Sequence, residues 1–325
     1  MRVAIVGTGA IGGFLGARLA LAGVATSALA RGDTVKALRA NGWRLRDEDG
    51  ERRAPTRVSA DATELGPQDL VVVAVKAQSL RGAVASIGPL LGPDTIVLPA
   101  MNGMPWWFFN DVAGPCRGLS LASVDPDGTI AAAIEGRRVL GGVVHLSCDR
   151  PEPGVVAHHR GRELIIGEPD HTESVRVRAV ADLFTAAGLD VTVSSDIHSD
   201  VWYKLWGTMT INPVSALTGA TVDAILDDDL VRTWCETAMV EVRRVGDRIG
   251  CPIAQTPAER NDVARKLGAF RTSMLQDADA GRSLELDALV GAVREIGAIV
   301  DVPTPTVDAL FGLTRLSARV RHLLG

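Results

Sequence analysis

Residues 2–22 read RVAIVGTGAIGGFLGARLALA, and this stretch decides the fold of the N-terminal half. The apolar run Val3 to Val6 has no polar alternation, which is typical of a strand buried in a parallel sheet. Glycines follow at positions 7, 9 and 12 as G-x-G-x-x-G, and a helical pattern runs on from Ala10 to Ala22. The order of strand, glycine turn and helix predicts a dinucleotide-binding domain.

Each glycine of this loop has a separate physical purpose in such a domain. Gly7 permits a tight turn, Gly9 lets the backbone approach a pyrophosphate, and Gly12 allows the helix to pack closely on the strand. The helix N-terminus then faces the anion. An incidental glycine turn is the alternative. The expected cofactor-binding residues of the loop are Gly7, Thr8, Gly9, Ala10, Ile11 and Gly12.

The residue that follows the second predicted strand bears on the choice of cofactor. This strand covers about Ala25 to Ala30 and ends at Arg31. An NAD enzyme normally offers Asp or Glu there to the ribose diol, whereas an arginine can pair with a 2'-phosphate. Arg31 therefore favours NADPH, with a solvated surface arginine as the alternative.

The chain falls into two parts that differ in their predicted secondary structure. Residues 1–194 alternate β-branched runs with helical stretches, as in βαβ units on a parallel sheet. Between Arg138 and Gly167, prolines and glycines interrupt short strands, which predicts an antiparallel addition at the sheet edge. The other elements expected here are strands at Asp69–Val75, Thr95–Leu98 and Asp190–Val193 and a helix near Glu173–Ala187.

Past Ile197 the strand signal nearly vanishes. Leu230 to Ile249 and Leu284 to Val300 carry apolar residues at helical spacing. We therefore expect an α/β fold class with two domains: a doubly wound Rossmann-type domain over 1–194 and an all-α domain over 195–325. A ligand is expected in a cleft between them.

Charge and composition exclude several classes of partner. The formal net charge is -5 and no run of Lys or Arg forms a nucleic-acid footprint. No apolar run reaches membrane-spanning length, and no signal peptide precedes the first strand. We expect a cytoplasmic protein with a small-molecule partner, no nucleic acid and no membrane; a homodimer is allowed.

Cysteines and histidines give no sign of a metal site. Cys116, Cys148, Cys235 and Cys251 stand far apart without a C-x-x-C pair, which indicates reduced structural thiols. The six histidines, including the adjacent His158 and His159, lack any known ligand spacing. No metal is therefore expected.

Several polar residues have both a functional and an ordinary interpretation. Lys76 follows a buried strand. It is expected either to contact a cofactor phosphate or ribose or to be an ordinary solvated lysine in a loop. Asn102 also follows a strand, where its amide bridges nicotinamide and substrate or forms an Asx turn. Lys204 can polarise and protonate a carbonyl oxygen, or it snorkels at the surface beside tryptophans.

The spacing around Lys204 suggests a continuous polar face. Lys204, Thr208 and Asn212 are four residues apart, and Pro213 then ends or kinks the helix. Without other information, Ser273 and Glu285 are a helix cap and part of a solvated helix face.

Taken together, these motifs resemble the ketopantoate reductase (2-dehydropantoate 2-reductase) family. The matching segments are V-G-T-G-A-I-G-G, L-A-R-G around Arg31, V-K-A-Q at Lys76, M-N-G-M at Asn102, W-Y-K-L-W-x-x-x-x-I-N-P-V-S-A-L-T-G, and T-S-M-L-Q-D followed by E-L-D. They span nearly the whole chain in order.

The resemblance implies a Rossmann domain, a helical domain of the 6-phosphogluconate-dehydrogenase-like kind and NADPH between them. By position, Lys204 is similar to the family's proton donor, and Asn102 to the asparagine that touches cofactor and substrate. Asn212 and Ser273 match substrate-binding positions, Thr208 occupies another, and Glu285 matches the catalytic acidic residue beside lysine and cofactor. Ser147 is expected near the cofactor.

Two departures from the family pattern bear on the substrate. Thr208 and Val222 stand where the family commonly has asparagine. Each lost amide removes a hydrogen-bonding pair, so the substrate is expected to be bulkier or more apolar than ketopantoate. Pro105, Trp106 and Trp107 point the same way if their rings lie beside Asn102, with core packing as the alternative.

The expected activity is NADPH-dependent reduction of a small 2-oxo acid, in the first place 2-dehydropantoate to pantoate, a step of pantothenate biosynthesis. An enzymatic rival is a 3-hydroxy acid or opine-type dehydrogenase, which shares the domain plan. A rival from another class is a non-catalytic NADPH-binding sensor.

Overall fold

The computed structural model describes residues 1–112 and 114–324. It divides into two compact units: unit 1 is Met1–Met101 with Gly128–Asp200, and unit 2 is Asn102–Asp127 with Val201–Gly325. The sequence pattern predicts one boundary at 194/195. In the structure, the segment 102–127 groups with the helical part of the chain instead.

Unit 1 contains the predicted parallel sheet, which confirms the α/β fold class. Its five strands have the order β5-β2-β1-β6-β7, and every pairing between neighbours is parallel. Taken in chain order, this arrangement is the doubly wound one of dinucleotide-binding folds. The strands are β1 (Val3–Val6), β2 (Thr26–Leu29), β5 (Arg57–Ser59), β6 (Gln68–Val73) and β7 (Leu91–Pro99).

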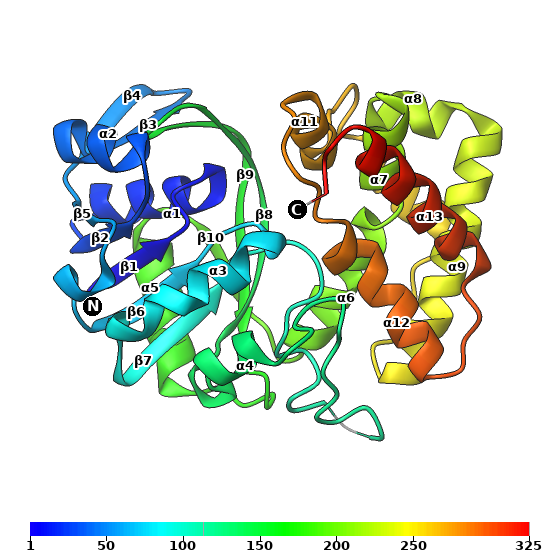
Figure 1. Cartoon of the computed structure of the whole chain (residues 1–325), viewed down its shortest axis with the longest axis horizontal. Helices are drawn as coiled ribbons and strands as arrows, with labels where there is room; N and C mark the ends of the chain where they lie inside the picture. The colour runs from blue at the N-terminus through cyan, green and yellow to red at the C-terminus, as the bar shows by residue number, and fades with distance from the viewer. Residues whose placement is uncertain (113, 325) are drawn as a thin grey trace. The chain divides into compact units, whose positions relative to one another are not determined.

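Burial explains why the apolar runs form this sheet. All four residues of β1 are buried, as are the last four of β6. The predicted strand 69–75 corresponds to β6, and 95–98 lies within β7. Helices connect the strands, as Figure 1 shows in its blue to cyan segments; they are α1 (Ala10–Leu21), α2 (Asp33–Asn41) and α3 (Ala77–Ile87).

A second sheet in unit 1 corrects one prediction. The segment 138–167 forms an antiparallel hairpin, but it meets the edge of the parallel sheet through a single parallel bridge between Val139 and Val97, not through an added antiparallel strand. Its second strand pairs in parallel with two other strands, so a separate sheet forms in the order β10-β9-β3-β4 with β8 on β9. The strands are β3 (Trp43–Asp47), β4 (Gly50–Ala54), β8 (Gly141–Glu152), β9 (Val155–Gly167) and β10 (Asp190–Val193).

Helix α1 contacts strands of both sheets, including β1 and β3. A Cβ atom at Gly16 would lie 2.6 Å from the Trp43 ring, so the glycine is needed for this close approach. Trp43 itself is 2% exposed. The remaining helices of unit 1 are α4 (Thr129–Ala133) and α5 (Val175–Ala186), the latter matching the helix predicted near 173–187.

Unit 2 is helical, as predicted. Helix α6 (Ile197–Thr208) begins in unit 1 and ends in unit 2. The predicted helix 230–249 is α9 (Asp229–Ile249), and the segment 284–300 contains a π-helical turn, Asp287–Gly291, that runs into α12 (Ala292–Ile299). The other helices are α7 (Ile211–Thr218), α8 (Val222–Asp227), α10 (Pro257–Arg265), α11 (Ser273–Asp279) and α13 (Pro305–Val320).

The helix break near Pro213 lies earlier than the sequence suggested. Helix α6 ends at Thr208 and α7 begins at Ile211, so Pro213 lies in the first turn of a new helix. A proline is tolerated there because the first backbone N–H groups of a helix have no partner within it. Asn212 therefore belongs to α7, and Lys204, Thr208 and Asn212 do not share one helix face.

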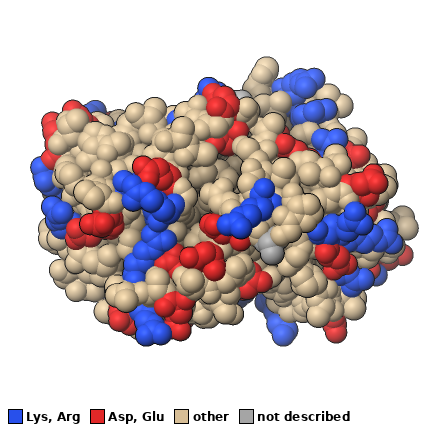
Figure 2. Space-filling view, turned by 90° about the horizontal axis from the view of Figure 1, so that it is seen from below, with Lys and Arg blue, Asp and Glu red and all other residues tan. Residues whose placement is uncertain are grey.

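The surface carries charges of both signs. On the face that Figure 2 shows, lysine and arginine side chains alternate with aspartate and glutamate. In the part of the chain that the structure describes, no helix is both long enough and apolar enough to cross a membrane.

Candidate active site

The glycine loop of unit 1 has the backbone geometry that its sequence requires. Gly7 has a φ of 94°, and a Cβ atom there would lie 2.8 Å from the Ala74 carbonyl oxygen. A Cβ at Gly12 would lie 2.0 Å from the Gly7 carbonyl oxygen. Both positions therefore need glycine to keep the loop and α1 against the sheet.

Gly9 differs from the other two glycines. A Cβ there would meet no protein atom within 4 Å, so packing does not require the glycine. Gly9 is also the N-cap of α1, which has no side-chain cap and no acidic residue in its first turn. The N–H groups of this turn are thus suited to an anion such as a dinucleotide pyrophosphate. Gly7, Thr8, Gly9, Ala10, Ile11 and Gly12 fit the predicted cofactor loop.

The other predicted cofactor residues of unit 1 lie on three elements. Arg31 is exposed just after β2, and no ion pair of this guanidinium occurs among the residues described. Lys76 is the N-cap of α3, directly after the segment that packs on Gly7. Ser147 lies at an irregularity of the β8–β9 ladder, and β8 contacts α1.

Unit 2 brings together a lysine, an amide and a carboxylate, which we call the lysine cluster: Lys204, Asn102 and Glu285. The Lys204 Nζ atom donates a hydrogen bond of 2.8 Å to Asn102 Oδ1. Lys204 comes from α6, Asn102 from the loop after β7, and Glu285 from just before the π-helical turn. The structure therefore joins three residues that lie far apart in the sequence.

A short backbone contact fixes the asparagine loop beside the glutamate segment. The Met104 N–H donates a 2.8 Å hydrogen bond to the Ala288 carbonyl. Gly103 has a φ of 85°, and a Cβ there would lie 2.8 Å from the Ala288 side chain. Gly103 is thus a site residue that the sequence analysis missed, although its place after Asn102 was a usable signal.

The surroundings of Lys204 tune its proton affinity. Burial lowers the pKa of the Lys204 ammonium to about 8, and the negative charge of Glu285 opposes this shift. Glu285 is 6% exposed. Desolvation penalises the charged form of lysine, whereas a nearby carboxylate favours it. The result is a lysine that is still protonated at neutral pH yet gives up its proton more readily than a surface lysine.

The two neighbours predicted from helical spacing have different environments. The Thr208 hydroxyl donates within α6, with the Lys204 carbonyl at 3.0 Å and the Leu205 carbonyl at 3.3 Å. Its proton is therefore engaged by the helix backbone. Asn212 lies in the first turn of α7, half-buried, and its side-chain amide makes no hydrogen bond with the residues described.

Ser273 is not the helix cap that the sequence suggested as its ordinary role. The N-cap of α11 is Thr272, whose hydroxyl accepts from the Leu275 N–H at 3.1 Å. Ser273 is the first helical residue, and its half-buried hydroxyl is not used in capping. Helix α11 packs on α7, so the helices that carry Ser273 and Asn212 are neighbours.

The residues that the sequence pattern linked to a more apolar substrate, Trp106, Trp107 and Val222, are buried in unit 2. Trp106 and Trp107 are 8% and 1% exposed, and neighbouring Phe108 packs against Trp202 with ring centroids 6.5 Å apart. This arrangement favours core packing over a row of rings beside Asn102. Val222 is buried in an apolar cluster that includes Ile211. Its side chain makes core contacts at a position where the family commonly has an asparagine amide.

A further cation, which the sequence pattern did not predict, lies near α6. The Arg260 guanidinium carbon lies 4.9 Å from the centre of the Tyr203 ring. A Cβ on Gly207, one turn after Lys204, would lie 2.4 Å from Arg260 Nε. No carboxylate pairs with Arg260 among the residues described. Arg260 lies in the polar sequence E-R-N-D of α10, and nothing in that sequence predicted that its side chain packs against α6.

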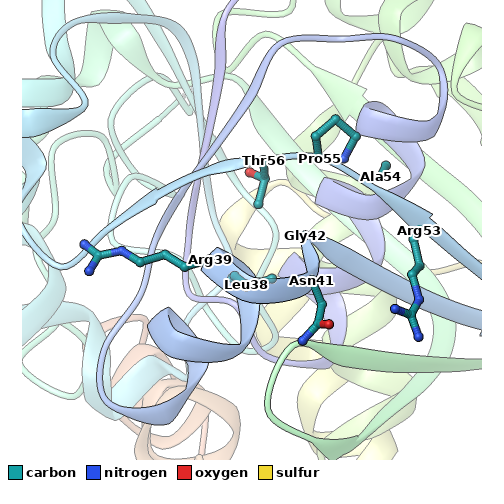
Figure 3. Close-up of a pocket in the computed structure, with 8 residues that line it drawn as sticks. All are labelled: Leu38, Arg39, Asn41, Gly42, Arg53, Ala54, Pro55 and Thr56. Carbon is teal, nitrogen blue, oxygen red and sulfur yellow. The ribbon is translucent and has the colours of Figure 1, made fainter.

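Two other features of the chain contain none of the predicted site residues. Unit 1 has a hollow of about 330 Å³. Figure 3 shows the residues that line it: Leu38, Arg39, Asn41, Gly42, Arg53, Ala54, Pro55 and Thr56. The four cysteines are free thiols. Burial raises the pKa of Cys235 to about 12 and also raises that of Cys148, so neither is an activated nucleophile.

Comparison with protein families assigns both parts of the chain. Residues 3–106 match "Ketopantoate reductase PanE/ApbA", and residues 196–318 match "Ketopantoate reductase PanE/ApbA C terminal". The two matches have the same order as the two predicted domains, and the second match begins at residue 196, close to the predicted boundary at 194/195.

Individual relatives agree over the full length. The chain is 45% identical to a 2-dehydropantoate 2-reductase of Mesorhizobium japonicum over 97% of each protein, and 30% identical to one of Halobacterium salinarum over 98% of this chain and 99% of that protein. A solved structure of a ketopantoate reductase-like protein from Ralstonia solanacearum MolK2 is 54% identical, covers 99% of both chains and has a TM-score of 0.96. The predicted family is thereby confirmed: this chain is an oxidoreductase of the ketopantoate reductase family.

Proposed function

We propose that this protein reduces 2-dehydropantoate, or a related branched 2-oxo acid, to the 2-hydroxy acid with NADPH. The observation that carries the proposal is the hydrogen bond from Lys204 Nζ to Asn102 Oδ1 at 2.8 Å. It fixes the direction of an ammonium whose pKa is lowered to about 8. A general acid works best when its pKa lies near the operating pH.

The reaction needs a hydride at the carbonyl carbon and a proton at the carbonyl oxygen. A bound nicotinamide dinucleotide supplies the hydride. Lys204 polarises the carbonyl oxygen through its ammonium and then donates a proton to it, becoming a neutral amine. Asn102 holds the ammonium in place by accepting a hydrogen bond from it, and Glu285 stabilises the charged form before the reaction. Solvent then returns a proton to Lys204.

Polar groups of unit 2 are candidates for the substrate carboxylate and hydroxyl. Asn212 and Ser273 lie on packed helices, and neither side chain is used to cap or brace the helices that carry them. Arg260 offers a cation one turn from Lys204 along α6. We assign the carboxylate to Ser273 and Asn212, with Arg260 as a longer-range attraction.

The polarity of the pocket bears on substrate range. With the Thr208 proton engaged by α6 and Val222 in an apolar cluster, two amides of the common family pattern are absent. A site with fewer hydrogen-bonding groups discriminates less strongly against a substrate that lacks the matching polar group. We therefore expect the enzyme to accept a branched 2-oxo acid that lacks the terminal hydroxyl, in addition to 2-dehydropantoate.

The test is an assay of NADPH oxidation by the purified full chain. The substrates are 2-dehydropantoate, 2-oxo-3-methylbutanoate, which lacks its hydroxymethyl group, and a 3-oxo acid. The proposal expects turnover of the first two and formation of the 2-hydroxy acid, identified by mass spectrometry. Turnover of the 3-oxo acid alone would favour the 3-hydroxy acid dehydrogenase. NADPH binding without oxidation of any 2-oxo acid would favour the non-catalytic sensor.

Cofactor choice is tested separately at Arg31. If Arg31 binds the 2'-phosphate, Arg31→Ala raises the KM for NADPH about tenfold or more and leaves that for NADH nearly unchanged. Arg39→Ala, which removes another exposed arginine of unit 1, is the matched control. Equal effects on both cofactors would contradict the assignment of NADPH.

A further inference from the structure

Two histidines and an aspartate of unit 1 lie together, and none of them is among the residues assigned above. They are His171, Asp196 and His198, each of which offers a ligand atom within 4.8 Å of the other two. His171 comes from the turn before α5, and the other two come from the start of α6. We propose that these three side chains bind a divalent transition-metal ion of the Zn²⁺ type.

The distances suit a single shared ion. Asp196 Oδ1 lies 3.7 Å from His171 Nδ1 and 4.0 Å from His198 Nδ1. His171 Nδ1 also lies 3.3 Å from the Ser195 carbonyl oxygen, and an ion bound at this nitrogen would replace that contact. On a tetrahedral Zn²⁺ with bonds of about 2.0–2.2 Å, two ligand atoms lie about 3.4 Å apart. The observed separations are slightly wider. Small rotations of the two imidazoles, whose ring centres are 5.2 Å apart, therefore bring the three atoms around one ion.

Local hydrogen bonds already orient the carboxylate. Asp196 caps α6, because its Oδ1 accepts from the Ser199 N–H at 3.2 Å. Its Oδ2 accepts from the Ser199 hydroxyl at 2.6 Å. The Asp196 N–H in turn donates to the Ser194 hydroxyl oxygen at 3.0 Å. Hydrogen bonds of this kind position the ligands of metal sites and reduce the cost of binding.

The backbone around His171 is fixed in an uncommon conformation. His171 has a φ of 65°, a left-handed value that residues with a side chain seldom adopt. Its N–H donates to the Glu168 carbonyl at 3.1 Å, and the neighbouring Asp170 carboxylate accepts from the Thr172 N–H at 3.0 Å. The turn therefore presents the imidazole toward the start of α6 from a defined position.

The three proposed ligand residues differ in how exposed they are to solvent. His198 is 2% exposed, whereas the side chains of His171 and Asp196 are 43% and 44% exposed. An ion can thus arrive from solvent and meet one ligand anchored in the core. Two imidazole nitrogens and one carboxylate oxygen suit Zn²⁺, Co²⁺ or Ni²⁺ better than Mg²⁺ or Ca²⁺, which prefer oxygen ligands.

A bound ion would join two segments of unit 1. One is the turn 168–172 and the other is the first turn of α6, the helix through which the chain continues into unit 2. The role that follows is structural, because none of the three residues belongs to the glycine loop or the lysine cluster. Metal binding is therefore expected to raise the melting temperature of the protein.

The experiment measures Zn²⁺ and Co²⁺ binding to the chelator-treated full chain by calorimetry and by visible absorption of Co²⁺. The test variants are His171→Asn and Asp196→Asn. Asparagine tolerates the left-handed backbone of the first position and keeps the helix cap at the second. Circular dichroism and melting temperature without metal verify that each variant is folded.

Two histidines serve as matched controls. His322 has a similar left-handed φ of 56°, and His159 lies 3.4 Å from the Asp149 carboxylate, with no third ligand group beside them in the described part of the chain. We expect one ion per wild-type chain, binding at least about tenfold weaker in both test variants, and unchanged binding in His322→Asn and His159→Asn. Absence of Zn²⁺ binding by the wild-type chain, or binding that both test variants retain, overturns the proposal.

Discussion

The glycine loop of unit 1 and the lysine cluster of unit 2 bring ligand-binding groups into place by different means. The loop works through its backbone, since Gly7 and Gly12 leave no room for a side chain and Gly9 exposes the N-terminus of α1. The lysine cluster works through side chains from three separate segments. In the function proposed above, cofactor binding thus depends on local sterics, whereas the chemistry depends on long-range packing.

The largest effect expected from this comparison concerns the proton donor. Lys204→Met should lower kcat by about a hundredfold or more, because no other group of the cluster can supply the proton, while cofactor affinity changes little. Steady-state kinetics and cofactor titration measure the two quantities. Lys266→Met, which removes an exposed lysine of unit 2, is the control. Near-normal turnover of Lys204→Met would remove this residue from its assigned role.

The next effect separates two glycines of the loop. Gly12→Ala should weaken cofactor binding and lower stability by about 1–3 kcal/mol, because its Cβ would meet the Gly7 carbonyl oxygen. Gly9→Ala should weaken cofactor binding about tenfold yet leave the melting temperature of the free protein unchanged, because its Cβ meets no protein atom.

Gly82→Ala is the control for these two variants. Gly82 lies inside α3, and a Cβ there also meets no protein atom. This substitution should stabilise the protein by about 0.5–1 kcal/mol through helix propensity and leave cofactor binding unchanged. Loss of stability in Gly9→Ala equal to that in Gly12→Ala would contradict the distinction drawn between the two glycines.

A moderate effect is expected in the pH dependence. Activity requires protonated Lys204, so kcat/KM of the wild type should fall as the pH rises through about 8. Glu285 favours the ammonium, and Glu285→Gln should therefore lower the pKa of Lys204 further and move this fall to lower pH. The pH profile of kcat/KM measures the shift. Asp287→Asn, a nearby acidic residue whose charge interacts with Arg315, should leave the midpoint unchanged.

The smallest effect is expected at Thr208. Thr208→Val keeps the branched shape and removes a hydroxyl whose proton is bound by the α6 backbone. We expect kcat and KM to change by less than about threefold, within the range of a weak neutral hydrogen bond. A tenfold rise in the KM for the 2-oxo acid would show instead that the hydroxyl oxygen binds substrate.

Fold and site differ in how far the sequence predicted them. Strands β1 and β6 were predictable because they are short, uninterrupted apolar runs rich in β-branched residues, a pattern typical of buried strands. The start of α7 was not, because Pro213 fits both the end of one helix and the first turn of the next. The second sheet was also missed, since the pairing of β9 with β3 joins distant segments.

The same division holds for the site residues. Ser273 could not be separated from its neighbour Thr272 as the helix cap without the position of the α11 N-terminus. Asn102 follows β7 in the sequence, yet it groups with unit 2 and bonds to Lys204. The histidine and aspartate set at the start of α6 had no sequence spacing to reveal it, because His171 precedes the other two by a helix and a strand.

By itself, the sequence determined the doubly wound unit, its glycine loop and the helical character of the C-terminal part. These features follow from spacings within one or two elements, where sterics and hydrophobic periodicity act directly. Only the tertiary structure decided that Lys204 meets Asn102, that Gly103 lies on Ala288 and that the proton of Thr208 is bound within its own helix. Such contacts depend on how distant segments pack and on where helices end, and local sequence preferences do not specify either.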